Sequence, residues 1–332
     1  MTAWTESSPD PPERIAIVLV PGFSLMAYAS TLEPLRAANR IAEAELYAWT
    51  TWSLGGGPMR ASNEVQVLTE VLDPAVDPVP DLVVVCAGLG GERHRDRRLE
   101  AALRLLARRG ARMAAVSTGS FLLARAGLLE GYRCTVHWEY IEAFERAFPQ
   151  LEVVRGLYVI DRDRLTCAGG TAPIDLMLEL LRRRHGPELA ARVTDEFVYG
   201  RGREADEPQR LAPAFRHRIH HPALVRAVEI MERNLERPLS TAAVARRTGL
   251  SARQLERLFK KHVGRSPARF YLDLRLERAR RLLRGSTLSV TEVAFACGFE
   301  TVSHFARCYR ARFGLRPSEE RREAATAAVA AP

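Results

Sequence analysis

One motif occurs twice in the last third of the chain, and this repeat restricts the possible folds more than any other feature. The first copy begins at Ser240 and the second at Ser289; Val-Ala and Gly-apolar pairs recur 49 residues apart, and later apolar and Arg positions recur 50 apart. Each copy opens with a residue suited to capping a short helix, continues with a Gly suited to a turn at positive φ, and ends in an amphipathic segment. This order is typical of a helix-turn-helix, whose second helix enters the major groove of DNA. The repeat therefore predicts an all-α domain with two helix-turn-helix motifs.

The segment between the two copies, Pro267–Leu283, predicts one long amphipathic helix, because proline suits a first helical turn and the apolar residues recur at helical spacing. The expected core positions are Leu272, Leu276, Ala279 and Leu283, and the arginines expected elsewhere on the helix surface are Arg275, Arg278 and Arg281. Such a helix spans about 25 Å. With the side chains and turns at its ends, it can hold two reading helices about one turn of DNA, ~34 Å, apart.

Three stretches of this region match the motifs of a known family. They are Gly-Leu-Ser-x-Arg-Gln-Leu-x-Arg-Leu-Phe at 249–259, Arg-Leu-Glu-Arg-Ala-Arg-Arg-Leu-Leu at 275–283, and Val-Ala-Phe-Ala-Cys-Gly-Phe-x-x-x-Ser-His-Phe at 293–305. Residues 219–318 resemble the AraC/XylS transcription regulators. The resemblance implies promoter DNA and RNA polymerase as partners, transcriptional activation, and base-reading residues near the start of each second helix.

The second helix of each copy supplies the candidate DNA contacts. In the first copy Arg253, Gln254 and Arg257 share the exposed side, and Arg can pair with guanine and Gln with adenine. The matching positions of the second copy are Thr301, Val302, Ser303, Ala306 and Arg307, of which Val302 and Ala306 can make only apolar contacts. The expected phosphate contacts are Lys260, Lys261, Arg310 and Arg312. For any single arginine, a place on the helix surface without a base contact remains the alternative.

The charge of the chain is concentrated in the same region. Residues 215–318 contain 22 Lys/Arg and 8 Asp/Glu, whereas the rest of the chain contains 27 and 32, so the two parts carry +14 and −5 of the total +9. Solvated helix faces explain scattered arginines but not this segregation, which indicates a nucleic-acid partner.

The cysteines and the apolar content favour a reduced, cytoplasmic protein. The five cysteines are widely spaced and form no Cys-x-x-Cys, which favours free thiols over a disulfide or zinc framework. No apolar run reaches the length that spans a membrane, and residues 1–12 lack the apolar core of a secretion signal. We expect no cofactor and no membrane partner.

The preceding part of the chain, residues 13–199, alternates apolar strands with helices. The expected strands are Arg14–Val20, Leu46–Leu54, Asp81–Cys86 and Arg112–Val116, and the expected helices between them are Met26–Ala42 and Asp96–Arg109. This alternation predicts an α/β domain, a parallel sheet with helices on both faces. In such sheets ligands bind beyond the carboxyl ends of the strands.

The segment that follows, residues 200–218, is polar, charged and contains Gly and Pro, which predicts a linker to the domain at 219–318. His217, His220 and His221 have no acidic or thiol partner at ligand spacing, so we expect solvated histidines and no metal site.

Ser117 occupies an expected strand-to-helix corner, the place where hydrolases of this class present a nucleophile. The surrounding run Ser-Thr-Gly-Ser-Phe-Leu-Leu-Ala (117–124) and Thr-Val-His-Trp (135–138) resemble the PfpI/ThiJ, class I glutamine amidotransferase-like domain. The resemblance covers residues 13–198 and implies a flavodoxin-like fold. Such a domain fused before an AraC-type domain is typical of the GlxA-like subgroup, and this resemblance implies a homodimer formed through the first domain.

The corner departs from the catalytic members of that fold, which carry Cys, usually followed by His. Here the residues are Ser117 and Thr118, and the nearest candidate base in sequence is His137. We expect a pocket that has kept its shape and lost its chemistry, and hence no enzyme. A hydrolase or amidase that uses Ser117 remains the alternative; Cys86, which ends an apolar strand, is more easily a buried thiol.

The sequence also offers a hypothesis for what fills the pocket. The resemblance places Glu33 near the corner, although a solvated carboxylate is an equal alternative, and Trp138 supplies an aromatic face unless it is simply core. His137 adjoins Trp138, and Thr171 begins another helix expected to approach the corner. Runs at 23–39 and 57–63 resemble regulators of carnitine, glycine betaine and arginine catabolism. The resemblance implies a zwitterionic effector, with its carboxylate at Ser117 and Thr118 and its cation at Glu33 and Trp138.

Three functions are possible for such a chain: a ligand-responsive regulator of a catabolic operon, an enzyme, and a protein that organises DNA without sequence preference. The repeated motif favours the first and third over the second, and the pocket at the corner favours the first.

Overall fold

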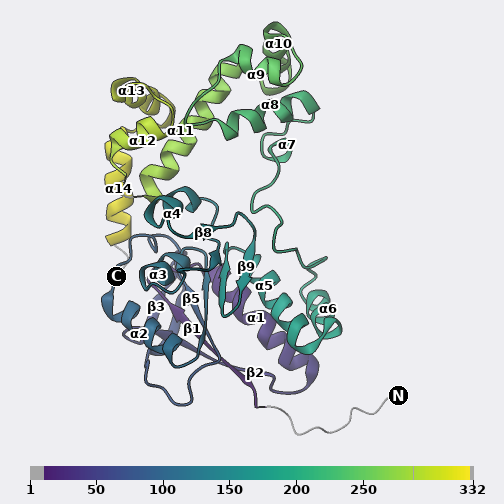
Figure 1. Ribbon diagram of the computed structural model, residues 1–332, viewed down its shortest axis with the longest axis vertical. Helices are drawn as coiled ribbons and strands as arrows, with labels where there is room; N and C mark the ends of the chain where they lie inside the picture. Colours follow the sequence, from purple (N-terminus) through teal and green to yellow (C-terminus); the bar gives the residue numbers. More distant parts are fainter. Residues whose placement is uncertain (1–10, 287, 330–332) are drawn as a thin grey trace. The chain divides into compact units, whose positions relative to one another are not determined.

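The computed structural model describes residues 11–286 and 288–329, and the chain divides into two compact units (Figure 1). The first unit reaches to Gln209 and the second begins at Arg210. The predicted linker, 200–218, is therefore divided: its part up to Gln209 packs on the α/β domain, and its remainder belongs to the helical domain. In the described part of the chain, none of the helices is long and apolar enough to cross a membrane.

The first unit is built on an eight-stranded sheet in the order β3-β4-β2-β1-β5-β6-β10-β9. Its strands are β1 (Glu13–Leu19), β2 (Tyr47–Ser53), β3 (Gly57–Arg60), β4 (Gln66–Val71), β5 (Leu82–Cys86), β6 (Arg112–Val116), β9 (Tyr158–Asp161) and β10 (Arg164–Cys167). The inner strands are parallel, and the edge strands β3 and β9 run antiparallel to their neighbours. A separate pair, β7 (Arg133–Cys134) and β8 (Glu152–Val153), is also parallel.

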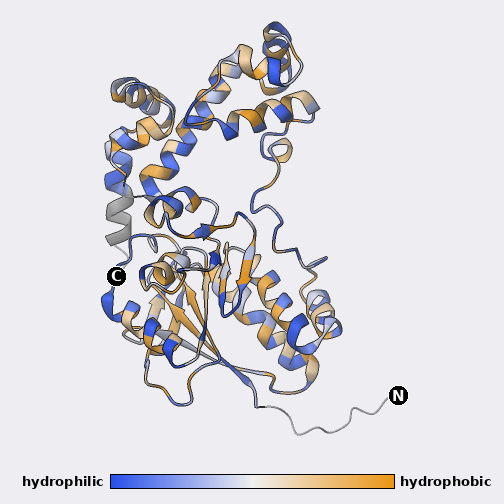
Figure 2. Ribbon diagram, viewed as in Figure 1, coloured by the Kyte–Doolittle hydropathy of each residue, from blue (hydrophilic) through white to orange (hydrophobic). Residues whose placement is uncertain are grey.

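Helices cover both faces of this sheet, as predicted. On one face lie α1 (Leu25–Ala42), α5 (Ala172–His185) and α6 (Pro187–Glu196), and on the other lie α2 (Arg97–Arg108), α3 (Gly119–Arg125) and α4 (Ile141–Ala147). All five residues of β5 are buried, which is why this strand is a continuous apolar run rather than an alternating one. Figure 2 shows this apolar character along the central strands. Two apolar cores therefore hold the loops at the carboxyl ends of β5 and β6 in place.

The second unit is entirely helical. Its helices are α7 (Pro213–Arg216), α8 (Pro222–Arg233), α9 (Thr241–Arg247), α10 (Ala252–Val263), α11 (Pro267–Gly285), α12 (Val290–Ala296), α13 (Val302–Phe313) and α14 (Pro317–Val329). They form two cores that share α11: Phe270 and Tyr271 belong to the first, and Leu276, Ala279 and Leu283 to the second. Figure 1 shows α10 and α13 near opposite ends of α11.

The two copies of the motif fold alike. The first helices, α9 and α12, have seven residues each, and the second helices, α10 and α13, have twelve each. Gly249 and Gly298 turn the chain between them with φ of +74° and +73°, a region that other residues rarely adopt. Ser240 and Ser289 cap the first helices through their hydroxyl groups. The repeat in the sequence is thus a repeat of structure.

Two arginines of α11 that were predicted to lie on the helix surface contact the end of α12 instead. Arg275 donates to the carbonyls of Cys297 (2.7 Å) and Gly298 (2.6 Å), and Arg278 is buried and donates to the carbonyl of Ala296 (2.7 Å). These carbonyls lie at the end of α12, where a helix leaves acceptors without intrahelical donors. Burial lowers the pKa of Arg275. The expectation of surface positions was wrong because the turn of the second motif needs donors that its own backbone does not supply.

The helical domain continues beyond residue 318, where the sequence prediction ended it. Glu320 of α14 has a side chain only 1% exposed, and it accepts hydrogen bonds from Tyr309 (3.0 Å), Arg280 (3.2 Å) and Arg284 (2.5 Å). Burial alone would raise the pKa of Glu320, but the hydrogen bonds from Arg284, Tyr309 and Arg280 hold it below its usual value. Helix α14 is therefore fastened to both α11 and α13.

Candidate DNA-reading helices and the Ser117 corner

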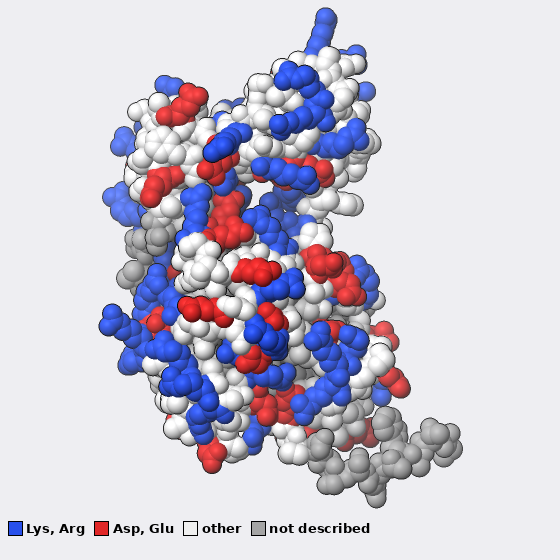
Figure 3. Space-filling view, in the orientation of Figure 1, with Lys and Arg blue, Asp and Glu red and all other residues white. Residues whose placement is uncertain are grey.

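Helices α10 and α13 present outward the residues predicted to contact DNA. The exposed side chains are those of Arg253, Gln254, Arg257, Lys260, Lys261, Thr301, Ser303, Arg307 and Arg310, and the half-buried ones are those of Val302 and Ala306. The opposite sides of these helices are fixed in the cores by Leu255 and Phe259 on α10 and by Phe305 and Tyr309 on α13. Figure 3 shows Lys and Arg gathered over the region of α9 and α10.

Two of the predicted base contacts also serve as helix caps. The side-chain oxygen of Gln254 accepts from the amide of Ser251 (2.8 Å), and the Thr301 hydroxyl accepts from the amide of His304 (3.2 Å). A glutamine that reads adenine needs both its oxygen and its nitrogen. Gln254 must therefore give up its capping bond before it can read a base in that way.

A third residue, Arg312, differs from its expected role. It pairs with Glu277 (3.1 Å) and Asp273 (3.7 Å) of α11 rather than pointing freely outward. A groove of about 660 Å³ lies beside α13. Its lining includes Ala306, Arg307, Arg310 and the exposed Arg316, which directly precedes α14. Arg316 was missed because it lies outside the repeated motif.

The sharp corner expected at Ser117 is present between β6 and α3. Ser117 has a φ of +59°, which costs a non-glycine residue about 1–3 kcal/mol and persists only where the surroundings fix it. Its amide donates to the carbonyl of Cys167 (2.9 Å) at the end of β10. Gly169 packs so closely that a Cβ there would lie 2.6 Å from that of Ser117. The corner and the loop after β10 are thus fitted to one another.

The side chain of Thr118 joins the corner to the loop after β5. It is fully buried and donates to the carbonyl of Gly88 (2.6 Å) in that loop. A Cβ at Gly91 would overlap the Thr118 hydroxyl oxygen, so this loop lies directly against it. The Thr118 hydroxyl is therefore engaged within the protein, which leaves the start of α3 as the part of Thr118 that could contact the predicted ligand.

His137 and Trp138 lie in the loop after β7, with ring centroids 5.5 Å apart. The Nδ1 atom of His137 accepts from the amide of Glu139 (3.4 Å), and burial lowers the pKa of the imidazole, which is therefore neutral at neutral pH. Among the described residues no hydrogen bond joins His137 to Ser117. An activated serine needs that bond.

Glu33 and Thr171, the remaining predicted pocket residues, are engaged in other contacts. The Glu33 carboxylate pairs with Arg36 (2.6 Å), which also reaches Glu196 of α6 (3.3 Å). The Thr171 hydroxyl accepts from Arg203 (2.9 Å). The sequence does not reveal these networks, because Glu196 and Arg203 are distant from them along the chain.

A different acid, Glu92, lies in the loop after β5, which packs on Thr118 of the corner. It lies in the same loop as Gly88 and Gly91, its side chain is 5% exposed, and one carboxylate oxygen pairs with Arg93 (3.3 Å). The other oxygen is buried and has no hydrogen-bond partner among the described residues, and burial raises the pKa of this carboxyl. The signal in the sequence was a glycine-rich run that ends in an acid directly after a buried strand.

This loop is fixed by Arg125 of α3, which donates to the carbonyls of Gly91 (3.0 Å), Glu92 (3.2 Å) and His94 (2.7 Å). Burial lowers the pKa of Arg125 to about 10. The helix that follows Ser117 therefore also positions the loop that carries Glu92.

The remaining candidate groups are buried cysteines and histidines that form no metal-binding cluster with the other described residues. Cys86, Cys134 and Cys167 are buried, and burial raises the pKa of each thiol, which disfavours the nucleophilic thiolate. His217, expected to be solvated, is half-buried against Phe270 and lies 3.6 Å from Glu232. No group of three or more metal-ligating side chains occurs among the described residues.

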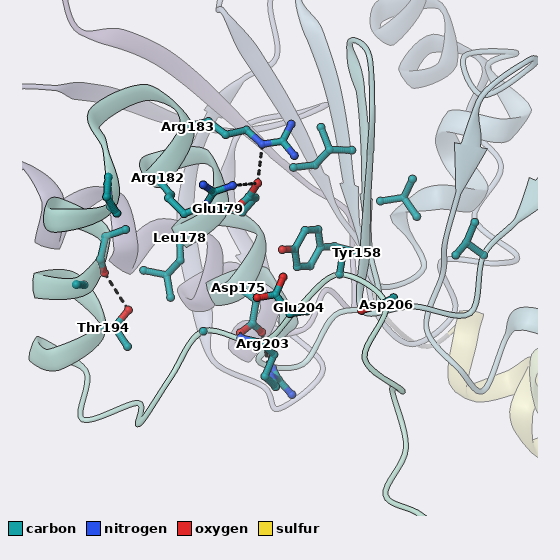
Figure 4. A pocket seen from close by; sticks show the side chains of 18 of the residues that line it. Tyr158, Asp175, Leu178, Glu179, Arg182, Arg183, Thr194, Arg203, Glu204 and Asp206 are labelled. Carbon is teal, nitrogen blue, oxygen red and sulfur yellow. Dashed lines mark hydrogen bonds and ion pairs between the residues drawn. The ribbon is translucent and has the colours of Figure 1, made fainter.

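A larger groove, of about 730 Å³, lies away from the corner at the β9 edge of the sheet (Figure 4). Its walls come from β9, α5, α6 and residues 202–206. Arg182 and Arg183 pair with Glu179, and Arg203 pairs with Asp175, whose side chain is completely buried. Most of its charges are thus neutralised within the groove, and no predicted site residue lines it.

The comparisons with known proteins agree with both parts of the fold. The DJ-1/PfpI family matches residues 13–183, and a helix-turn-helix domain matches residues 244–323. The transcriptional regulator CdhR of Pseudomonas aeruginosa is 48% identical over 92% of this chain and 90% of its own length.

The chain belongs to the AraC-type transcriptional regulators that carry a DJ-1/PfpI domain. Another regulator of this subgroup, GlxA of Rhizobium meliloti, is 40% identical over 93% of this chain and 96% of its own length. The crystal structure of an AraC family regulator from Pseudomonas putida superposes with a TM-score of 0.52 and 29% identity, covering 56% of this chain and all of its own. The predicted family, fold class and regulatory function are confirmed.

Proposed function

We propose that this regulator is a cytoplasmic homodimer that activates a catabolic operon with RNA polymerase when a small zwitterionic metabolite occupies the pocket at Ser117. The candidates are carnitine, glycine betaine and arginine. The observation that carries the proposal is a strained, closely packed corner without an activated nucleophile, joined to a repeated DNA-reading motif. The metabolite acts as a switch only if it binds the active arrangement more tightly than the inactive one.

Glu92 replaces Glu33 as the carboxylate of this pocket. It is buried beside the corner with one oxygen unpaired, whereas Glu33 is half-exposed and paired with Arg36. A cation bound at Glu92 also gains from an aromatic face, which Trp138 supplies. The Ser117 hydroxyl then donates to the carboxylate of the same ligand.

The pocket binds its ligand without catalysing a reaction. The serine lacks a hydrogen-bonded base among the described residues, and the thiols of the domain are buried. The competing function, a hydrolase or amidase, has in its favour that Ser117 occupies the right corner. Turnover of amide or ester substrates that disappears in Ser117→Ala would establish the enzyme and remove this part of the proposal.

Calorimetric titration of the full chain with carnitine, glycine betaine, dimethylglycine and arginine tests the effector class. We expect at least one to bind, and Glu92→Gln to weaken it about tenfold or more, since losing a charged partner costs about 1.5–3 kcal/mol. Glu33→Gln is the matched control and leaves the affinity unchanged. The absence of binding by all four compounds discards the zwitterion, and equal effects of the two variants discard Glu92.

A further inference from the structure

The segment that leaves the α/β domain towards the DNA-binding domain is fastened to the loops around Ser117. We call this segment, residues 203–209, the strap. It lies within the predicted linker, and the Ala205 carbonyl accepts from the amide of Leu157 (2.8 Å), while a Cβ at Gly156 would overlap the same oxygen. The strap is therefore seated directly against the chain just before β9.

The first anchor of the strap is Arg203. Its guanidinium pairs with Asp175 (2.7 Å), whose side chain has no exposed surface, and its backbone amide donates to the other oxygen of the same carboxylate (2.7 Å). It also donates to the Thr171 hydroxyl (2.9 Å) at the start of α5. Figure 4 shows Arg203 and Asp175 together at the lower wall of the groove. Because the carboxylate is buried, breaking this pair leaves an uncompensated charge.

The second anchor is Gln209, the last residue of the α/β domain. Its side-chain nitrogen lies within hydrogen-bond distance of the Thr135 hydroxyl (3.2 Å) and of the carbonyls of Val136 (3.1 Å) and Gly156 (2.7 Å). Thr135 and Val136 directly precede His137 and Trp138. The point where the chain leaves the domain is thus held by the loop that carries His137 and Trp138.

Each anchor is linked to the Ser117 corner through one neighbouring loop. The hydroxyl of Ser120, in the first turn after Ser117, donates to the Thr135 carbonyl (2.7 Å), which joins the corner to the Gln209 anchor. On the other side, Gly169 packs on Ser117 and lies two residues before Thr171, which joins the corner to the Arg203 anchor. Any occupant that moves the 135–138 loop or the 169–171 loop therefore changes the hydrogen bonds of the strap.

We infer that the strap is the coupling element of the regulator: Arg203 and Gln209 hold it on the α/β domain, and a ligand that occupies the corner releases it. This inference rests on the proposed site at Ser117 but not on the identity of its ligand. Coupling is reciprocal, so a variant that loosens the strap must also make the corner easier to occupy.

The test uses a covalent occupant and needs no effector. Ser117→Cys in the full chain, with the partly exposed Cys308 replaced by Ser, is alkylated with N-ethylmaleimide, and amide hydrogen exchange is measured before and after. The amides of Arg203 and Leu157 report on the strap directly, since they donate to Asp175 and Ala205. We expect these amides to exchange about fivefold faster or more after alkylation. Unchanged exchange of both amides overturns the inference.

The reciprocal measurement guards against a misfolded variant. The rate of alkylation of the thiol introduced at position 117 is compared in otherwise identical chains that carry Gln209→Ala or Arg192→Ala. Arg192 is the control, because it is exposed on α6 and forms no hydrogen bond or ion pair with the strap or the corner among the described residues. We expect Gln209→Ala to accelerate the reaction severalfold and Arg192→Ala to leave it unchanged. Equal rates in the two variants contradict the inference, whereas failure of every metabolite to bind contradicts only the proposed effector.

Discussion

Individual residues in this regulator often perform a task other than the one their type suggests. Gln254 and Thr301 were predicted to read bases, but each also closes the first turn of its helix. Arg253, Arg257 and Arg307 are exposed, and none has a partner among the described residues. The arginines are therefore better placed than Gln254 and Thr301 to discriminate between bases.

Replacing Arg253 by Ala removes a candidate guanine contact, and we expect it to cost about 1–3 kcal/mol and to relax sequence preference at one position. Lys261→Ala, in the last turn of the same helix, removes a candidate phosphate contact. We expect it to weaken binding to all sequences similarly and to reduce the salt dependence. Fluorescence anisotropy with cognate and scrambled duplexes at several salt concentrations separates the two. A uniform loss in Arg253→Ala assigns that residue to phosphate instead.

His137 gives the α/β domain a pH dependence with a definite sign. Burial lowers the pKa of His137 in the folded chain, so the unfolded chain takes up a proton that the folded one does not. Its contribution to the free energy of unfolding is complete above the ordinary value of about 6.5 and falls as the pH decreases below it. Urea unfolding at pH 7.5 and 5.5 measures this, and the loss is smaller in His137→Asn. If the unmodified protein and His137→Asn lose equal stability, the pH dependence arises from His94 or His185 instead, because burial also lowers their pKa values.

Among the helices and strands, α11 has a double task, because it serves both cores of the DNA-binding domain. Arg275 and Arg278 reach from it to the carbonyls at the end of α12, and Arg280 and Arg284 reach to Glu320 of α14. The second motif is thus fixed by hydrogen bonds from α11, in addition to its apolar core.

Arg278→Met keeps the aliphatic part of the side chain and removes the bond to Ala296, and we expect a loss of about 1.5–3 kcal/mol in stability. The effect falls mainly on α12 and α13, because the bond to Ala296 is short, whereas the pair of Arg278 with Glu236, between α8 and α9, is long (3.9 Å) and Glu236 is exposed. Amide hydrogen exchange of the full chain resolves the two halves, with Arg246→Met, exposed on α9, as control. Equal acceleration in both halves refutes the division into two cores.

The sequence predicts the positions of these helices and strands better than it predicts the hydrogen bonds between them. The paired caps and glycines located the two motifs, and continuous apolar runs located β1, β5 and β6, since both signals are local. The hydrogen bonds of Arg278, Arg36 and Arg203 instead join residues 18, 160 and 28 positions apart, which no local pattern encodes. The corner at Ser117 was predictable as backbone geometry, whereas the burial of Glu92 and the pairing of Glu33 with Arg36 were not.

In the complete chain, each of the two units has its own core, and the segment between them is only partly free. Arg203 and Gln209 hold the strap on the first unit, and the short helix α7, the first helix of the second unit, begins at Pro213. The segment that remains between Gln209 and Pro213 is short. In the proposed mechanism, release of the strap lengthens the segment that precedes the second unit.

The DNA-binding unit itself reads DNA through a spacer of fixed length, which makes its operator sensitive to spacing. Since α10 and α13 pack on different ends of the single helix α11, the two half-sites must lie about one turn, ~10–10.5 base pairs, apart. Inserting five base pairs between them places the second half-site on the opposite face of the duplex, and we expect binding to fall to the level of scrambled DNA.

An insertion of ten base pairs distinguishes this arrangement from two reading units on a flexible tether. It restores the face but adds about 34 Å, which a flexible tether spans and a helix of 19 residues does not. We therefore expect the ten-base-pair insertion to abolish two-site binding as completely as the five-base-pair insertion. Footprinting on the three operators measures this directly. Protection of both half-sites after the longer insertion would mean that α11 does not set the spacing.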